Sequence, residues 1–204
     1  LLAEVPVISH EVGQFAMYPD FNEIEKYKGS IRHHAYAAYK NGQEEKGLFD
    51  RWEDFFRASG KLSAQCYRLD VETALRSREM SGFQLLDIQD FPGQGVATVG
   101  ILNSFLENKG HITAEEWRSF CSDTVVLGSM SKFIYTADEE ILCGVYVSST
   151  RHDFSADKIS WSLRIGGQEA ECGSVSLVKR DGRLLQYGTI ELSVSAEKTL
   201  TAVL

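Results

Sequence analysis

The chain has 204 residues, of which 43% are hydrophobic and 25% are charged, and its formal net charge at pH 7 is -8. These proportions exclude an intrinsically disordered chain, and 17 glycines with only 3 prolines exclude collagen-like and proline-rich chains. An excess of 29 acidic over 21 basic residues argues against a nucleic-acid partner, because phosphate binding needs clustered positive charge. No uncharged apolar run approaches the roughly 20 residues that span a bilayer, so we expect a soluble chain without a membrane segment.

Residues 1–14 (LLAEVPVISHEVGQ) lack the basic start of a secretory signal, and Glu4 interrupts their apolar stretch. Because the chain opens inside a strand-like run, we expect a fragment or a processed piece of a longer protein. The four cysteines form no CxxC pair, and none lies at metal-ligand spacing from a histidine, so we expect neither a metal nor a cofactor. A disulfide between Cys143 and Cys172 stays open beside the alternative of reduced thiols.

The periodicity of the sequence changes near residue 122. Before that point, short apolar runs alternate with amphipathic ones, which is typical of parallel strands joined by crossover helices. The expected strands cover 5–10 and 83–88, and the expected helices cover 21–27, 48–59, 63–78 and 96–108. Gly60 is expected to end the helix before it, and Thr113 and Glu116 form a capping box that opens a further helix. Two strands make neither a barrel nor a good open sheet, so this part is expected to be incomplete.

After that point the sequence has the alternation of an all-β domain. Strands are expected over 141–148, 158–165, 171–178, 184–194 and 199–204. Asp181 and Gly182 separate two of them and predict a hairpin turn. The spacing of strands and turns predicts an immunoglobulin-like β-sandwich.

Two segments at the ends of expected strands concentrate polar side chains. Glu11 follows the first strand, where catalytic groups collect in βα proteins, although a solvated loop glutamate is the simpler alternative. The segment 86–95 (LDIQDFPGQG) offers donors and acceptors suited to sugar hydroxyls, with a structural turn as the alternative. Asn22 and Glu23 are interpreted as helix-terminal residues, with Asn22 as the N-cap.

Three stretches carry a resemblance to a known family: residues 6–29 (PVISHEVGQFAMYPDFNEIEKYKG), 59–67 and 82–110 (GFQLLDIQDFPGQGVATVGILNSFLENKG). The chain resembles glycoside hydrolase family 2, which contains β-galactosidases, β-glucuronidases and β-mannosidases, and it resembles large bacterial members in particular. The resemblance implies an α/β fold over 1–122, the last βα units of an incomplete TIM barrel, followed over 123–204 by an immunoglobulin-like sandwich.

The resemblance also implies roles for single residues. Glu11 would be the nucleophile, with Val12 in place of the commoner aromatic residue after it. His10 would be a neighbouring donor, and Gln89, Asp90 and Gln94 would lie near the sugar. The acid/base glutamate of the family would lie upstream of residue 1.

The resulting expectation is a fragment of a retaining, exo-acting β-glycosidase that hydrolyses terminal β-linked sugars and is inactive alone. The expected partner is a carbohydrate substrate, and open parallel sheet edges favour a homo-oligomer. Relatives are often exported to the periplasm or beyond. The alternative is a non-catalytic carbohydrate-binding or scaffold protein.

Overall fold

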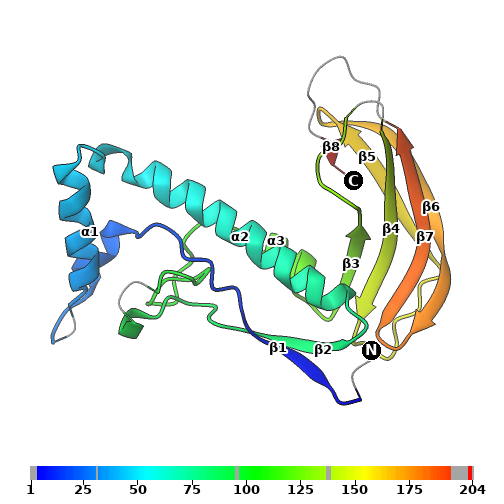
Figure 1. Cartoon of the computed structure of the whole chain (residues 1–204), viewed down its shortest axis with the longest axis horizontal. Coiled ribbons are helices and arrows are strands. Elements are labelled where there is room, and N and C mark those ends of the chain that lie inside the picture. The colour runs from blue at the N-terminus through cyan, green and yellow to red at the C-terminus, as the bar shows by residue number, and fades with distance from the viewer. Residues whose placement is uncertain (1–3, 31, 95–96, 137–138, 194–201, 204) are drawn as a thin grey trace. The chain divides into compact units, whose positions relative to one another are not determined.

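In a computed structural model, the chain divides into two compact units, Leu1–Arg118 and Ser119–Leu204 (Figure 1). We call them the N-terminal and C-terminal units and describe each by itself. The structure describes all residues except 1–3, 31, 95–96, 137–138, 194–201 and 204.

The N-terminal unit contains a pair of parallel strands, β1 (Val7–Val12) and β2 (Met80–Leu85), connected through the long helix α2 (Trp52–Arg76). The other helical elements of the chain up to Phe120 are short. They are η1 (Phe21–Lys26), α1 (His34–Glu45), η2 (Phe49–Arg51), η3 (Pro92–Gln94) and α3 (Ala114–Phe120). The capping box is confirmed, because the Glu116 amide donates to Thr113 Oγ1 over 3.1 Å and the Thr113 amide donates to Glu116 Oε2 over 2.7 Å.

Helix α2 does not stop at Gly60, so the prediction of two helices there was wrong. Gly60 is buried in the helix interior against His111, and a Cβ atom at this position would lie 2.2 Å from the imidazole ring. Glycine in a helix costs about 1 kcal/mol relative to alanine. Glycine is nevertheless needed at this position, because the His111 ring leaves no room for a side chain.

The predicted helix over 96–108 was also wrong over its described residues. Residues 97–108 contain no helix. Isolated backbone bridges join them to Gln89 and Phe91, and Asp90 N donates to Leu102 O over 3.0 Å. The side chain of Asn103 accepts from the backbone amides of Phe105 and Glu107, over 2.9 and 3.0 Å. Asparagine competes in this way with the hydrogen bonds that a helix would need.

The C-terminal unit is one antiparallel sheet. Its strands are β3 (Thr124–Ser129), β4 (Glu140–Ser149), β5 (Lys158–Ile165), β6 (Gln168–Asp181), β7 (Leu184–Ser193) and the two-residue β8 (Ala202–Val203). The order across the sheet is β3-β4-β7-β6-β5-β8. The hairpin at Asp181 and Gly182 is confirmed, because Asp181 pairs with Leu184 and Gly182 has a φ of 59°. Part of the strand expected over 199–204 lies outside the described residues.

The predicted fold class, an incomplete TIM barrel followed by an immunoglobulin-like sandwich, was wrong. The chain is a mixed α/β structure with few helices, and its antiparallel strands form a single curled sheet instead of two facing ones (Figure 1). The continuity comes from β6, which pairs with β5 over residues 168–176 and with β7 over 177–181. Alternation along a strand indicates which face is buried, but it does not indicate where a strand changes partner.

The core of the C-terminal unit lies on one face of this sheet. Its buried members come from β4 to β7: Cys143, Val145, Val147, Leu163, Val175, Leu185, Tyr187, Ile190 and Leu192. The Tyr187 hydroxyl donates to Ala156 O over 2.7 Å, so the buried polar end of this ring is satisfied. All four cysteines are free, with Cys143 buried and Cys172 exposed, which excludes the disulfide between them. Within the described residues, no helix combines the length and the apolar character that crossing a membrane requires.

Candidate functional site

Glu11 lies at the carboxyl end of β1 in a backbone conformation that few residues adopt. Its φ of 57° falls in the left-handed region, and the β1–β2 register is irregular between Ser9 and Val12. A non-glycine residue held in that region indicates a local constraint, and such residues cluster at functional sites. Because of this register shift, Glu11 does not follow the regular alternation of side chains between the two faces of β1.

The next residues explain how the backbone at Glu11 is fixed. Gly13 has a φ of 94°, and a Cβ atom there would lie 1.8 Å from the Tyr67 ring. Tyr67 is fully buried, and its hydroxyl lies 2.9 and 2.8 Å from the carbonyl oxygens of Asp87 and Val99, to which it donates in turn. The buried tyrosine thus ties helix α2 to the loop after β2, directly beneath the turn that follows Glu11.

The carboxylate of Glu11 is half exposed and has polar neighbours on both oxygens. Gln14 Nε2 donates to Oε2 over 2.8 Å, and His10 Nδ1 lies 3.6 Å from Oε1. His10, predicted as the neighbouring donor, therefore lies next to the carboxylate. Gln14 was not predicted, and a glutamine three residues after the glutamate gave no signal for this contact.

Glu11 lines a pocket of about 420 Å³ between β1 and the C-terminal half of α2. Ser9, His10, Asp70 and Thr73 also line it. Of the described residues lining this pocket, two carry carboxyl groups, Glu11 and Asp70, and burial raises the pKa of Asp70. The pocket therefore combines an exposed carboxylate with a second carboxyl group whose pKa is raised by burial.

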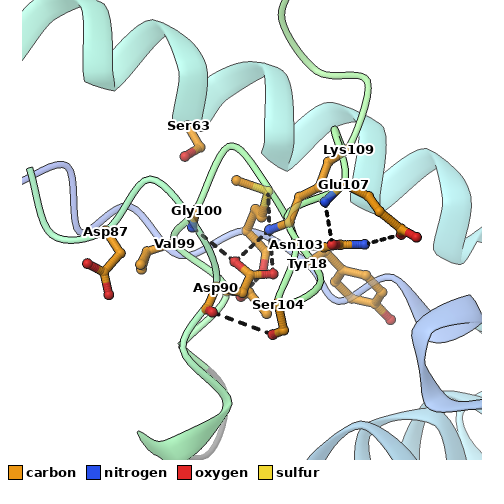
Figure 2. Close-up of polar contacts among 12 residues, drawn as sticks. Tyr18, Ser63, Asp87, Asp90, Val99, Gly100, Asn103, Ser104, Glu107 and Lys109 are labelled. Carbon is orange, nitrogen blue, oxygen red and sulfur yellow. Dashed lines mark hydrogen bonds and ion pairs between the residues drawn. The ribbon is translucent and has the colours of Figure 1, made fainter. Parts of the chain in front are cut away.

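Asp90 lies in a different environment, which Figure 2 shows. Its side chain is 3% exposed and forms an ion pair with the equally buried Lys109, whose Nζ lies 2.7 Å from Oδ1 and 2.6 Å from Oδ2. The Gly100 amide also donates to Oδ1, over 2.9 Å. Burial raises the pKa of Asp90, and the Lys109 ammonium and this amide oppose that rise. The ion pair and the hydrogen bond thus link Asp90 to Lys109 and Gly100, which follow it in the sequence.

The two predicted glutamines lie on the same loop. Gln89 is half-buried, and its backbone bridges to Leu102, whereas the Gln94 side chain is exposed at the end of η3. Among the described residues that line the Glu11 pocket, His10 is present and Gln89, Asp90 and Gln94 are not. Their assignment to a sugar site stays a prediction.

Glu23 lies in the first turn of η1, as its interpretation as a helix-terminal residue predicts, but its side chain is buried. The N-cap of η1 is Asp20, which accepts from the Asn22 amide over 2.9 Å, so Asn22 as N-cap was wrong. Glu23 is 1% exposed, and neither of its carboxylate oxygens has a hydrogen-bond partner among the described residues. Burial, with Asp90 nearby, raises its pKa to about 7. Helical spacing could not reveal this burial, because the residue lies in a single 3-10 turn.

Among the described residues, no group of three or more histidine, cysteine, aspartate and glutamate side chains could hold a metal ion. His33 serves as the N-cap of α1, with Nδ1 accepting from the Tyr36 amide over 3.3 Å. No family model matches the chain, and no curated protein matches it significantly.

Proposed function

We propose that this chain supplies the nucleophile of a retaining, exo-acting β-glycosidase that acts on terminal β-linked sugars, and that Glu11 is that nucleophile. One observation carries the proposal: Glu11 is a carboxylate at the end of a parallel strand, held at positive φ, oriented by Gln14 and open to a pocket. Carboxyl ends of parallel strands are the usual place for catalytic groups in α/β structures. The resemblance of residues 6–29 and 82–110 to glycoside hydrolase family 2 supports the same assignment.

The chemistry needs an ionised carboxylate that can reach an anomeric carbon. In the first step a Glu11 oxygen bonds to that carbon, and the glycosidic C–O bond breaks with its electron pair on the leaving oxygen. A general acid normally protonates that oxygen, and water later hydrolyses the glycosyl ester. The amide of Gln14 suits the nucleophile's role, because its hydrogen bond to Oε2 orients the carboxylate, while the nearest polar group to the attacking Oε1 is His10 Nδ1 at 3.6 Å.

The proposal places the general acid outside these 204 residues. Glu23 has a raised pKa, but with 1% exposure it cannot reach a substrate. Asp70 is the other carboxyl group among the described residues of the Glu11 pocket, which makes it the residue to test against this part of the proposal.

Leaving-group dependence tests the proposal on the chain as it exists. A 2,4-dinitrophenolate leaves without protonation, so 2,4-dinitrophenyl β-galactoside, β-glucuronide and β-mannoside are offered separately. The chain alone is expected to be inactive on ordinary glycosides because it lacks the general acid. The activated substrate bypasses that need, so with the matching sugar we expect a burst of about one dinitrophenolate per chain, and azide should accelerate the slow phase that follows. Methyl glycosides, which need a general acid, should not be hydrolysed.

The Glu11→Gln variant should lower the burst rate by orders of magnitude, whereas the exposed Glu25→Gln serves as a matched control and should leave it unchanged. An equal burst in the Glu11→Gln variant would remove Glu11 from the role. Hydrolysis of methyl glycosides that is lost in Asp70→Asn would place the acid within this chain. Saturable sugar binding without any burst would favour the alternative of a non-catalytic carbohydrate-binding protein.

A further inference from the structure

A second pocket of about 390 Å³ lies in the N-terminal unit, against the other half of α2. Its walls come from the start of η1, from α2 between Trp52 and Lys61, and from residues 109–111. From Phe56 to Thr73, which lines the Glu11 pocket, the helix rises about 25 Å. The two pockets therefore share a helix and no lining residue.

One side of this second pocket is aromatic. Trp52 and Phe56 lie one turn apart on the same face of α2, and both are half-buried. The Trp52 ring is supported from behind by Phe21 and Phe49, with ring centroids 5.6 and 6.5 Å away. Phe56 packs against the His111 ring at 4.4 Å. Because neighbouring rings hold them, these two side chains lose little freedom when a ligand binds.

The other lining side chains are polar and carry both signs of charge. Glu53 and Arg57 are exposed and one helical turn apart, and Lys61 follows one turn later. Asp20 contributes a second carboxylate from the start of η1. The buried Lys109 also borders the pocket, but its charge is matched by Asp90. Among the described residues that line the pocket, the formal charges of Asp20 and Glu53 balance those of Arg57 and Lys61, so no excess of charge favours an ionic ligand.

We propose that this pocket is a binding site for a neutral pyranose ring, separate from the site at Glu11. The flat apolar face of the sugar would lie on Trp52 and Phe56, as aromatic side chains present a large apolar surface. Each sugar hydroxyl both donates and accepts, so the mixture of Asp20, Glu53, Arg57 and Lys61 can satisfy the ring edge. The inference comes from this pocket's own lining and does not depend on the role of Glu11.

Saturation-transfer NMR with methyl β-D-glucopyranoside tests the site, and methyl β-D-glucuronide serves as its charged counterpart. We expect saturable binding of the neutral glycoside, and the part of the glucuronide response that Trp52→Phe removes should be at least fivefold weaker. Trp52→Phe keeps a ring in the aromatic cluster but removes platform area, and Arg57→Met keeps the aliphatic stem. Each should raise the dissociation constant about threefold or more, while Glu11→Gln and Lys132→Met should leave it unchanged.

Three results would overturn the proposal: no saturable signal from the neutral glycoside, equal affinity in the Trp52→Phe and Arg57→Met variants, or a preference for the glucuronide. A loss of binding in Glu11→Gln would also overturn it, because the sugar would then occupy the other pocket. Circular dichroism of each variant checks that the fold is kept. These binding outcomes can be interpreted even if Glu11 proves not to be a nucleophile.

Discussion

Both units have buried apolar clusters, but the buried charged side chains of the described residues all lie in the N-terminal unit. The C-terminal unit is held by an apolar core, in which each member contributes a share of the stability. The N-terminal unit buries Glu23, Ser63, Asp90, Thr98 and Asn103, and its loop after β2 depends on the contact between Asp90 and Lys109. The difference teaches that an apolar core spreads its contribution to stability over many residues, whereas a buried charged pair concentrates it in two, and the loss of one leaves the other unpaired.

Removing one partner of the buried pair should have the largest effect. Lys109→Met leaves the Asp90 carboxylate buried without its cation, which should lower the free energy of unfolding by about 3–5 kcal/mol. Urea unfolding of the variant measures this loss. The double variant Asp90→Leu/Lys109→Met should recover part of it, because neither charge is then buried. A single-variant loss below about 1 kcal/mol would mean that the pair is solvated and would break the contrast between the units.

Truncating a buried side chain tests how much the apolar core of the C-terminal unit contributes to stability. Leu185 is 3% exposed, and Leu185→Ala should cost about 2–5 kcal/mol through lost burial and the cavity that remains. Leu142 lies on the neighbouring strand β4 and is 48% exposed, so Leu142→Ala is the matched control, with a change within about 0.5 kcal/mol. Equal losses at the two positions would contradict the assignment of the buried face.

Glu23 should make the N-terminal unit less stable as the pH rises. Its pKa is raised from 4.5 to about 7 by burial, so the unfolded chain loses the proton first. The contribution of protonated Glu23 to the free energy of unfolding is fully present below pH 4.5. It is lost between pH 4.5 and 7, by a total of about 3 kcal/mol. Urea titrations from pH 4.5 to 7 should show that the free energy of unfolding of Glu23→Gln rises relative to that of the intact chain. An unchanged pH profile in that variant would show that Glu23 is ionised in the folded chain.

His111 should act in the opposite direction over an overlapping range. Burial against α2 lowers its pKa from 6.5 to about 4, so the folded state favours the neutral ring. The contribution of neutral His111 to the free energy of unfolding is therefore fully present above pH 6.5. It is lost as the pH falls from 6.5 to 4, again by about 3 kcal/mol. In the intact chain the two trends partly cancel. His111→Gln should uncover the Glu23 trend, and Glu23→Gln should uncover the acid loss. Parallel profiles in both variants would refute the pair of assignments.

The sequence predicted the C-terminal unit far better than the N-terminal one. The period-two alternation located β5 residue for residue and four further strands approximately, and Asp181 and Gly182 located the hairpin. It missed β3, and it could not distinguish one curled sheet from two facing sheets.

The N-terminal unit was harder because its decisive contacts join residues far apart in sequence. Residue 60 is a glycine inside a helix because His111 packs on it. The helix predicted over 96–108 failed for a different reason, since Asn103 makes local side-chain hydrogen bonds to the backbone. The contact of Asp90 with Lys109 has no periodic signature. For the candidate site, the position of Glu11 at a strand end was readable, but its positive φ and its bond to Gln14 were not.

The most direct test of the central claim is to locate a covalent sugar on the chain by mass spectrometry. The 2,4-dinitrophenyl 2-deoxy-2-fluoro derivatives of the three β-glycosides release their phenolate without an acid, and fluorine slows hydrolysis of the ester that forms. The account predicts one fluoroglycosyl group per chain, with the matching sugar, on the peptide that contains Glu11, and none in Glu11→Gln. A label on another residue, equal labelling of Glu11→Gln, or no label with any of the three sugars would contradict it.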